Sequence, residues 1–180
     1  MQEIRSLLTE RDWVLSEEER MDVFSIPRLE VATDTEIYKK RNITSSVGLE
    51  MPVFIFVSKL DFSADIPSLG MELIRGIVKR ESKKRFMRVL ENKGLQDVSP
   101  TESRVEFSDD KEINHFTYQS CYSKDDEEYI INSGCFILHN SNNYYILGYS
   151  KPKDMSILIL ESNQTVDIES EISTIVDSIV

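Results

Sequence analysis

Residues 71–95 have the sequence MELIRGIVKRESKKRFMRVLENKGL, and this stretch decides the fold. Its apolar residues recur three or four positions apart, so a helix places them on a single stripe. They are Met71, Ile74, Ile77, Val78, Phe86, Val89 and Leu90. Ser68, just after Pro67, is the expected N-cap. Gly94 can adopt the left-handed conformation that ends a helix, and Leu95 can pack back against the last turn. The stretch therefore predicts one long amphipathic helix.

Strands are expected on the N-terminal side of this helix. Residues 21–26 and 29–38 carry a strand-favouring pattern, and Pro27 separates them. Residues 51–60 are apolar at successive positions, which is typical of a strand buried on both faces in the interior of a sheet. Residues 1–20 show no clear pattern, and we expect them to form a loosely packed N-terminal segment.

Beyond the helix the pattern changes to a series of strands. They are residues 103–107, 112–122, 128–139 and 144–149, with a further short strand at 157–160. The breaks between the first four are short, and short connections join antiparallel neighbours, so we expect a meander. Asp167 can cap a final helix, whose apolar residues share one face. These residues are Ile168, Ile172, Ile175, Val176 and Ile179.

Together these elements predict an α+β fold. The long helix and the C-terminal helix are expected to pack on an antiparallel β-sheet, in two layers or as a sandwich. A length of 180 residues fits one domain, and the chain contains no linker, repeat or low-complexity tract. We therefore expect residues 1–180 to form a single domain.

The composition limits the partners of the chain. It has 32 Asp and Glu against 21 Lys and Arg, which gives a formal net charge of -11 at pH 7. Such a chain repels nucleic acid and anionic lipid unless a local basic surface works against the overall field. The longest apolar runs, 53–57 and 157–160, are far shorter than the ~20 residues that cross a bilayer. With no signal peptide at the N-terminus, we expect a cytoplasmic protein that does not bind membranes.

Glycines, prolines and hydrophobic residues along the chain follow the pattern of a known family. They are Phe24, Pro27, Val31, Thr35, Tyr38, residues 59–63 (KLDFS), Phe86, Leu90, Gly94, Val98, Tyr118, Gly134, residues 145–149 (YILGY) and Pro152. In these residues the chain resembles a family of uncharacterised archaeal proteins, mainly haloarchaeal, and the order of its elements resembles the PsbP-like fold. The resemblance implies a PsbP-like architecture and no particular reaction. PsbP-like proteins act mostly as accessory or partner-binding modules, and a likeness of fold alone does not define a function.

Two cysteines and two histidines lie on neighbouring strands of one expected hairpin. A turn centred near Asp126 places Cys121 and Cys135 too far apart for a disulfide, so we expect free thiols in a reducing compartment. In this register the cysteines, His115 and His139 can all share one sheet face, with the two histidines nearly opposite each other. Their spacing along each strand, ~13 to ~20 Å, is too large for one metal ion. We therefore expect no metal and no cofactor, and a cross-strand polar pair of histidines.

Motifs of catalysis are missing from the sequence. There is no Gly-x-Ser-x-Gly elbow, no Gly-rich phosphate loop and no His-Glu-x-x-His helix. Acidic residues cluster in turns, where carboxylates are normally solvated. The sequence therefore favours a protein without enzymatic activity and supports no catalytic residue.

The long helix carries an unusual concentration of basic residues for so acidic a chain. They are Arg75, Lys79, Arg80, Lys83, Lys84, Arg85, Arg88 and Lys93. Residues four apart form rows along a helix, so one hypothesis is a docking face for an acidic protein or another anionic partner. That hypothesis names Arg75, Lys79, Arg80, Lys83, Lys84 and Arg88. The alternative is a solvated helix face, which is the more usual role of charged runs. Nucleic acid is disfavoured as the partner because no aromatic residue alternates with these cations outside the apolar stripe.

A second candidate surface lies on the strands of the meander. Several tyrosines occur there, and His115, His139 and Tyr145 are the residues that we single out for binding on an open sheet face. The leading hypothesis is a non-enzymatic partner-binding module that uses this sheet face or the basic helix. The alternative is a small-molecule-binding protein or enzyme with a pocket between helix and sheet. Exposed tyrosines on a flat surface favour the first, and a concave pocket with inward polar groups favours the second.

Overall fold

The computed structural model describes residues 1–26, 29–41, 43–45, 51–62, 71–108, 111–140, 143–160 and 167–179. Its elements run along the chain as α1 (Gln2–Glu10), β1 (Trp13–Ile26), β2 (Leu29–Lys40), β3 (Ile43–Ser45), β4 (Phe54–Phe62), α2 (Met71–Asn92), β5 (Gln96–Ser108), β6 (Lys111–Lys124), β7 (Glu127–Asn140), β8 (Asn143–Pro152), the 3-10 turn η2 (Met155–Ile157), β9 (Leu158–Leu160) and α3 (Ile168–Ile179). The expected α+β class is confirmed.

Seven strands form one antiparallel sheet in the order β1-β2-β4-β8-β7-β6-β5. The four strands after α2 are consecutive neighbours, so the expected meander is confirmed. β4 lies inside the sheet between β2 and β8, and its residues from Phe54 to Ser58 are buried, as expected of an interior strand. β3 and β9 pair in a separate two-stranded sheet.

Both edge strands of the large sheet pair irregularly with their neighbours. β1 has two register shifts against β2, and β5 has two against β6. Pro100 lies at the second shift on β5 and has no N–H to donate. Register shifts of this kind mark β-bulges, which bend and twist a strand locally.

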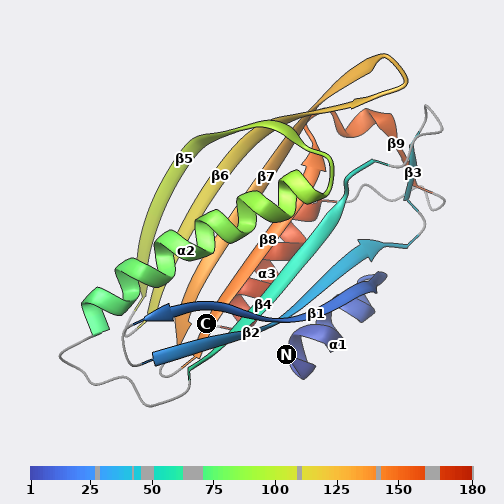
Figure 1. Cartoon of the computed structure of the whole chain (residues 1–180). Helices are drawn as coiled ribbons and strands as arrows, with labels where there is room; N and C mark the ends of the chain where they lie inside the picture. Colours follow the sequence, from blue (N-terminus) through green and yellow to red (C-terminus); the bar gives the residue numbers. More distant parts are fainter. Residues whose placement is uncertain are drawn as a thin grey trace.

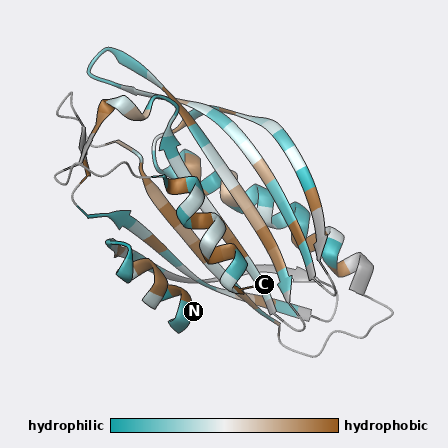
Figure 2. Cartoon of the chain, turned by 180° about the vertical axis from the view of Figure 1, so that it is seen from behind, coloured by the Kyte–Doolittle hydropathy of each residue, from teal (hydrophilic) through white to brown (hydrophobic). Residues whose placement is uncertain are grey.

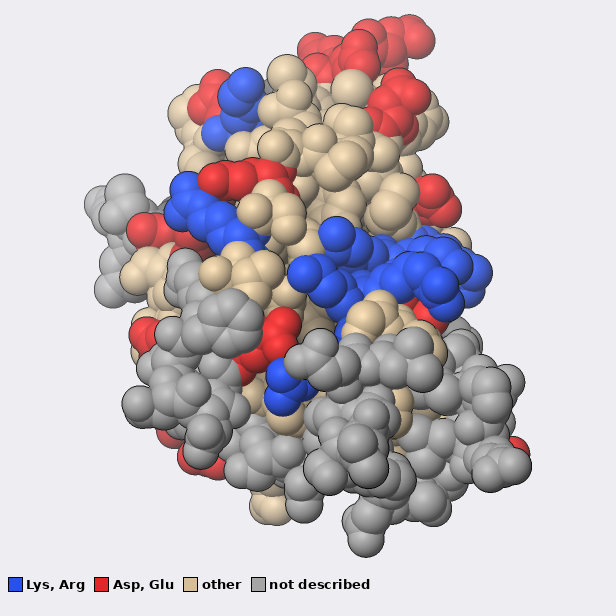
Figure 3. Space-filling view, turned by 90° about the vertical axis from the view of Figure 1, so that its left-hand side faces the viewer, with Lys and Arg blue, Asp and Glu red and all other residues tan. Residues whose placement is uncertain are grey.

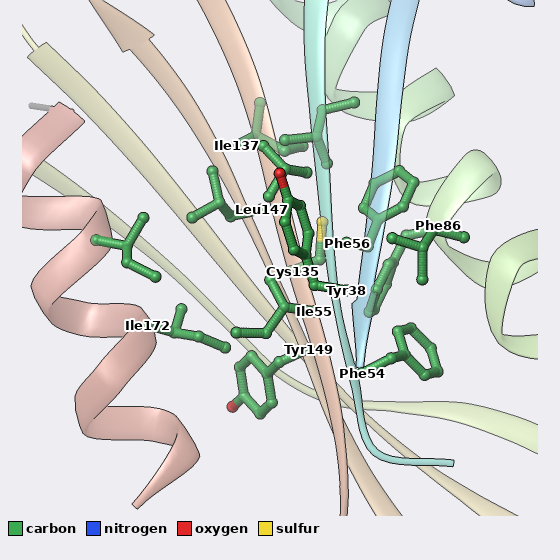
Figure 4. Packing of buried hydrophobic residues seen from close by; sticks show 14 of the residues in the cluster. Tyr38, Phe54, Ile55, Phe56, Phe86, Cys135, Ile137, Leu147, Tyr149 and Ile172 are labelled. Carbon is green, nitrogen blue, oxygen red and sulfur yellow. The ribbon is translucent and has the colours of Figure 1, made fainter. Parts of the chain in front are cut away.

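Helices cover both faces of the sheet, so the fold has three layers, whereas we expected either two layers or a sandwich. Figure 1 shows α2 across one face and α3 across the other. Phe86 of α2 and Ile172 of α3 point toward the sheet from opposite sides (Figure 4). We name these two sides the α2 face and the α3 face. α1 contacts both β1 and α3. The second cover has a physical reason, because the central strands are apolar on both faces and each face must be shielded from water (Figure 2).

The apolar stripe predicted for α2 faces the sheet. Ile74, Val78 and Leu90 are buried, like Phe86. Met71 lies at the start of the helix, and the expected N-cap falls outside the described residues. The helix ends as predicted at Gly94, whose φ is +83°, and the Leu95 N–H donates to the Leu90 carbonyl at 3.1 Å.

The Phe86 ring fixes the position of α2 over the sheet. It lies 6.2 Å from the ring of Phe56 and 5.8 Å from the ring of Tyr118, between ring centroids. It also lies directly on Gly148, where a Cβ atom would meet the Phe86 ring at 2.2 Å. Gly148 is therefore required for close approach of the helix and not for a special backbone conformation.

A side-chain cap begins α3, and a polar cluster joins this helix to the sheet. Asp167 accepts a hydrogen bond from the Ser170 N–H at 3.1 Å, which confirms the predicted N-cap. Glu171 accepts from Lys40 Nζ at 2.8 Å and from the Trp13 indole N–H at 2.6 Å. The cluster therefore ties α3 to the strands β1 and β2.

The first twenty residues are not the loosely packed segment that we expected. Residues 2–10 form α1, which buries Ile4 and Leu8, and Trp13 is buried at the start of β1. Arg5 on α1 forms an ion pair with Glu36 on β2, which also accepts a hydrogen bond from Tyr38. Apolar burial and this ion pair fix the N-terminal helix to the sheet.

Two glycine-to-alanine substitutions should have opposite effects on stability. Gly148→Ala inserts a methyl group into the space of the Phe86 ring and should lower the free energy of unfolding by about 1–3 kcal/mol. Gly76→Ala, at an exposed position of α2 where an added Cβ would meet no atom within 4 Å, should raise it by about 1 kcal/mol. Urea denaturation measures both. Equal stability of the two variants would contradict the close packing of α2 on β8.

Candidate functional site

Five of the six predicted docking residues of α2 form two rows along the helix. Lys79 and Lys83 form one row, and Arg80, Lys84 and Arg88 form the other. We call these five residues the basic face. Figure 3 shows Lys and Arg side chains gathered over this region, on a surface where acidic side chains are otherwise dispersed.

Lys79 and Lys83 lie together over one aromatic ring of the sheet. Their Nζ atoms are 5.4 Å and 3.7 Å from the centroid of the Phe116 ring, which is within the range of a cation–π interaction. Burial and the neighbouring charge of Lys79 lower the pKa of Lys83. Neither lysine forms an ion pair with any residue that the structure describes. Two like charges are thus held side by side on a ring and are not neutralised by a carboxylate of the described chain.

The outer row of the basic face is partly neutralised. Arg80 Nε and Lys84 Nζ lie 3.0 Å and 3.1 Å from the same Glu81 carboxylate oxygen. The hydrogen bond from Lys84, followed by that from Arg80, lowers the pKa of Glu81. The two cationic side chains are still 65% and 54% exposed, so they remain accessible. Arg88 is exposed and forms no ion pair within the described ranges.

Two other arginines of α2 point toward the sheet. Arg85, which we counted among the basic residues of the helix, is buried, and its Nη2 donates to Thr35 Oγ1 at 2.7 Å. Arg75, one of the predicted docking residues, lies 3.6 Å from a Glu112 carboxylate oxygen. Burial raises the pKa of Tyr144, and a hydrogen bond with the Arg75 guanidinium opposes that increase. Arg75 and Arg85 therefore hold α2 on the sheet rather than contribute to the basic face.

The predicted grouping of cysteines and histidines on one face is wrong. Residues paired between β6 and β7 have numbers that sum to 251, so His115 pairs with Phe136 and Cys135 pairs with Phe116. A register that differs by one residue exchanges the two faces of a strand. His115 and Cys121 therefore lie on the α3 face, and Cys135 and His139 lie on the α2 face.

This division also explains why the thiols are free. Cys121 and Cys135 both remain unpaired, as expected. Burial raises the pKa of Cys135, whereas a hydrogen bond with Glu128 is the main cause that raises the pKa of Cys121. Within the described residues no group of three or more His, Cys, Asp and Glu side chains is placed to hold a metal ion.

The three residues predicted for sheet-face binding are not brought together. His139 is buried on the α2 face, with its ring 4.3 Å from that of Tyr144. Tyr145 lies half-buried on the α3 face, opposite Leu138. His115 also lies on the α3 face, where it stacks on Phe136 with 4.0 Å between ring centroids and 3° between ring planes.

A flat tyrosine-lined surface is not present in the described sheet. Tyr118, Tyr144 and Tyr149 are buried, because helices cover both faces. The polar concavity proposed as the alternative does have a counterpart. A groove of about 410 Å³ on the α3 face is lined by residues of α3 and by His115 on β6. Of the predicted sheet-face residues, His115 lines it, and His139 and Tyr145 do not.

Two features of these sites were missed from the sequence. The first is Phe116, which lies under the two lysines. Phe116, Tyr118 and Ser120 alternate along β6 and so share one face, but only the register of the hairpin shows which face that is. On α3, Glu169, Ser173 and Asp177 are four residues apart and form a polar row beside the apolar one. That row was visible in the sequence, but we considered only the apolar face of this helix.

Comparisons of the sequence with known families and curated proteins found no relative. No model of a known protein family matches the chain, and a search of curated proteins finds no match. None of the helices in the described part of the chain is long and apolar enough to cross a membrane.

Alkaline pH should destabilise the fold through groups that burial keeps protonated. Burial raises the pKa of Tyr118 to about 12, and burial also raises the pKa of Tyr149 and of Cys135. The unfolded chain releases these protons from about pH 9 to 10 upward, whereas the folded chain retains them. The stabilisation is thus fully present below pH 9 and declines as the pH rises, by about 1.4 kcal/mol per pH unit above 10 for Tyr118 alone.

Urea denaturation at pH 8, 9, 10 and 11 measures this decline. Tyr118→Phe removes one titrating group and should reduce the loss of stability between pH 10 and 11 relative to the unsubstituted chain. An identical pH dependence for the two proteins would show that Tyr118 is not kept protonated by burial.

Proposed function

We propose that this protein is a non-enzymatic partner-binding module, and that its basic face docks an acidic segment of another protein. The placement of Lys79 and Lys83 over Phe116 carries the proposal. Holding two ammonium groups together in a partly desolvated position is unfavourable, and a carboxylate placed between them would relieve this repulsion. The outer row of Arg80, Lys84 and Arg88 extends the same charge along the helix.

The overall charge supports an acidic protein segment over nucleic acid. A chain with a net charge of -11 repels a polyanion over long distances, whereas a short acidic segment interacts mainly with the local surface. Phe116 is covered by the lysines and only 2% exposed, so it offers no face on which a base could stack.

The dimensions of the basic face fit a short extended peptide. Lys79 and Arg88 are nine residues apart on α2, which corresponds to about 14 Å along the helix axis. An extended chain covers that distance in about four residues. A partner with two or three acidic residues in such a segment could contact both rows at once.

The cellular setting is part of the same proposal. Two free thiols on opposite sheet faces suit a reducing compartment, so we place this module in the cytoplasm. The resemblance of its element order to the PsbP-like fold supports an accessory role, because PsbP-like proteins act mostly as accessory or partner-binding modules.

Charge reversal tests the basic face. The double substitution Lys79→Glu and Lys83→Glu should weaken binding of a fluorescently labelled Glu-rich peptide at least tenfold, measured by fluorescence anisotropy at low salt. The unsubstituted protein should lose affinity steeply with added salt, because the contacts are between exposed charges.

A matched control separates the local effect from net charge. Lys124→Glu together with Lys153→Glu makes the same change in charge at exposed positions away from α2. This variant should weaken peptide binding less than twofold. Equal weakening in both variants, or no binding of the peptide to the unsubstituted protein, would refute docking at the basic face.

A further inference from the structure

The groove on the α3 face is separate from the basic face. It lies between α3 and the outer strands of the meander, on the side of the sheet that α2 does not touch. Its volume of about 410 Å³ lies within the range of small-molecule sites. α3 packs on β7 and β8, and the groove extends from there over β6 to the edge strand β5.

One wall of the groove is a polar row on α3. Glu169, Ser173 and Asp177 follow one another at intervals of four residues and all line the groove. The two carboxylates are eight residues apart, which places them about 12 Å from each other along the helix axis. Glu102 on β5 contributes a third carboxylate from the opposite wall.

The floor between these carboxylates is largely apolar. Ile113, Phe136 and Val176 line it, together with the ring of His115. His115 and Phe136 stack on each other, which occupies one face of each ring. The groove thus has charged residues along its walls and apolar side chains on its floor.

The charges that face the groove are predominantly negative. Among the described residues that line the groove, Arg104 is the one Lys or Arg, and it lies 2.7 Å from Glu102. From outside the lining, Lys151 Nζ lies 3.0 Å from Glu169, which also accepts a hydrogen bond from Tyr149 at 3.4 Å. Asp177 forms no ion pair with any described residue, so no described cation neutralises its carboxylate.

We propose that this groove binds a small linear organic diamine or polyamine. One ammonium group contacts Asp177, the methylene chain lies over Phe136 and Val176, and a second ammonium group lies at the end of the groove formed by Glu169. Ammonium groups form charge-assisted hydrogen bonds with carboxylates, and the methylene chain buries apolar surface between them. A metal ion fits less well, because no group of three metal-ligating side chains occurs among the described residues.

Calorimetric titration with spermidine at low ionic strength tests the site. The probe should bind the unsubstituted protein at one site, and Asp177→Asn together with Glu169→Gln should weaken binding at least fivefold. Both positions are exposed, so the fold should tolerate the changes. NMR signals of the His115 and Phe136 rings should shift on titration, since these rings form the floor.

Non-specific attraction to an acidic protein is the competing explanation, and a matched variant distinguishes it. Glu10→Gln together with Glu91→Gln removes the same charge at exposed positions on α1 and α2. It should leave spermidine affinity within twofold. Equal loss in both double variants, or ring signals that do not move, would overturn the proposal. Charge reversal of Lys79 and Lys83 should not weaken spermidine binding, so this test is independent of the basic face.

Discussion

The register of the β6–β7 hairpin is the constraint on which both candidate sites depend. Asp125 and Asp126 form a two-residue turn in which both residues have positive φ, 52° and 65°. Such turns match the twist of the flanking strands and fix which residues face each other. The register set here brings Phe116 under the lysines of α2 and His115 to the groove beside α3. A slip of one residue would exchange these positions and abolish both arrangements.

Two glycines on neighbouring strands each allow an aromatic ring to pack directly against the backbone of the sheet, one on each face. Gly148 accepts the Phe86 ring of α2 on one face, and Gly134 accepts the Tyr149 ring on the other, where a Cβ atom would lie 2.2 Å from the ring. At both positions a residue with a side chain would displace the ring, so only glycine fits. The backbone of Gly148 consequently fixes the position of Phe86 and with it that of α2, and the ring of Tyr149, which lines the groove, lies against the backbone of Gly134.

Much of the fold could be predicted from periodicity, whereas the placement of side chains could not. The end of α2 at Gly94, the meander and the Asp167 cap all follow from local signals. The short helix α1 was missed because its apolar signal consists of only a few residues, with Ile4 and Leu8 buried. Arg85 was counted among the basic residues of the helix but not assigned to the core, although its position seven residues after Val78 places it on the apolar stripe. Its burial depends on Thr35, which is distant in sequence.

The candidate sites were predictable only in part for a related reason. Lys79 and Lys83 were expected to share a row, because helical spacing is local. The Phe116 ring beneath them and the groove beside α3 depend on pairings between strands, and a turn centre misjudged by half a residue changes the face of every partner. Local sequence therefore specifies which residues are charged, and the hairpin register specifies what they face.

The irregular edges of the large sheet have a consequence for association between copies of the chain. A long flat edge presents unpaired N–H and C=O groups and can recruit further strands, which is a route to fibrils. On β5, two bulges and Pro100 interrupt this row of donors and acceptors, and two bulges interrupt it on β1. Growth of the sheet by strand addition is thereby hindered at both ends.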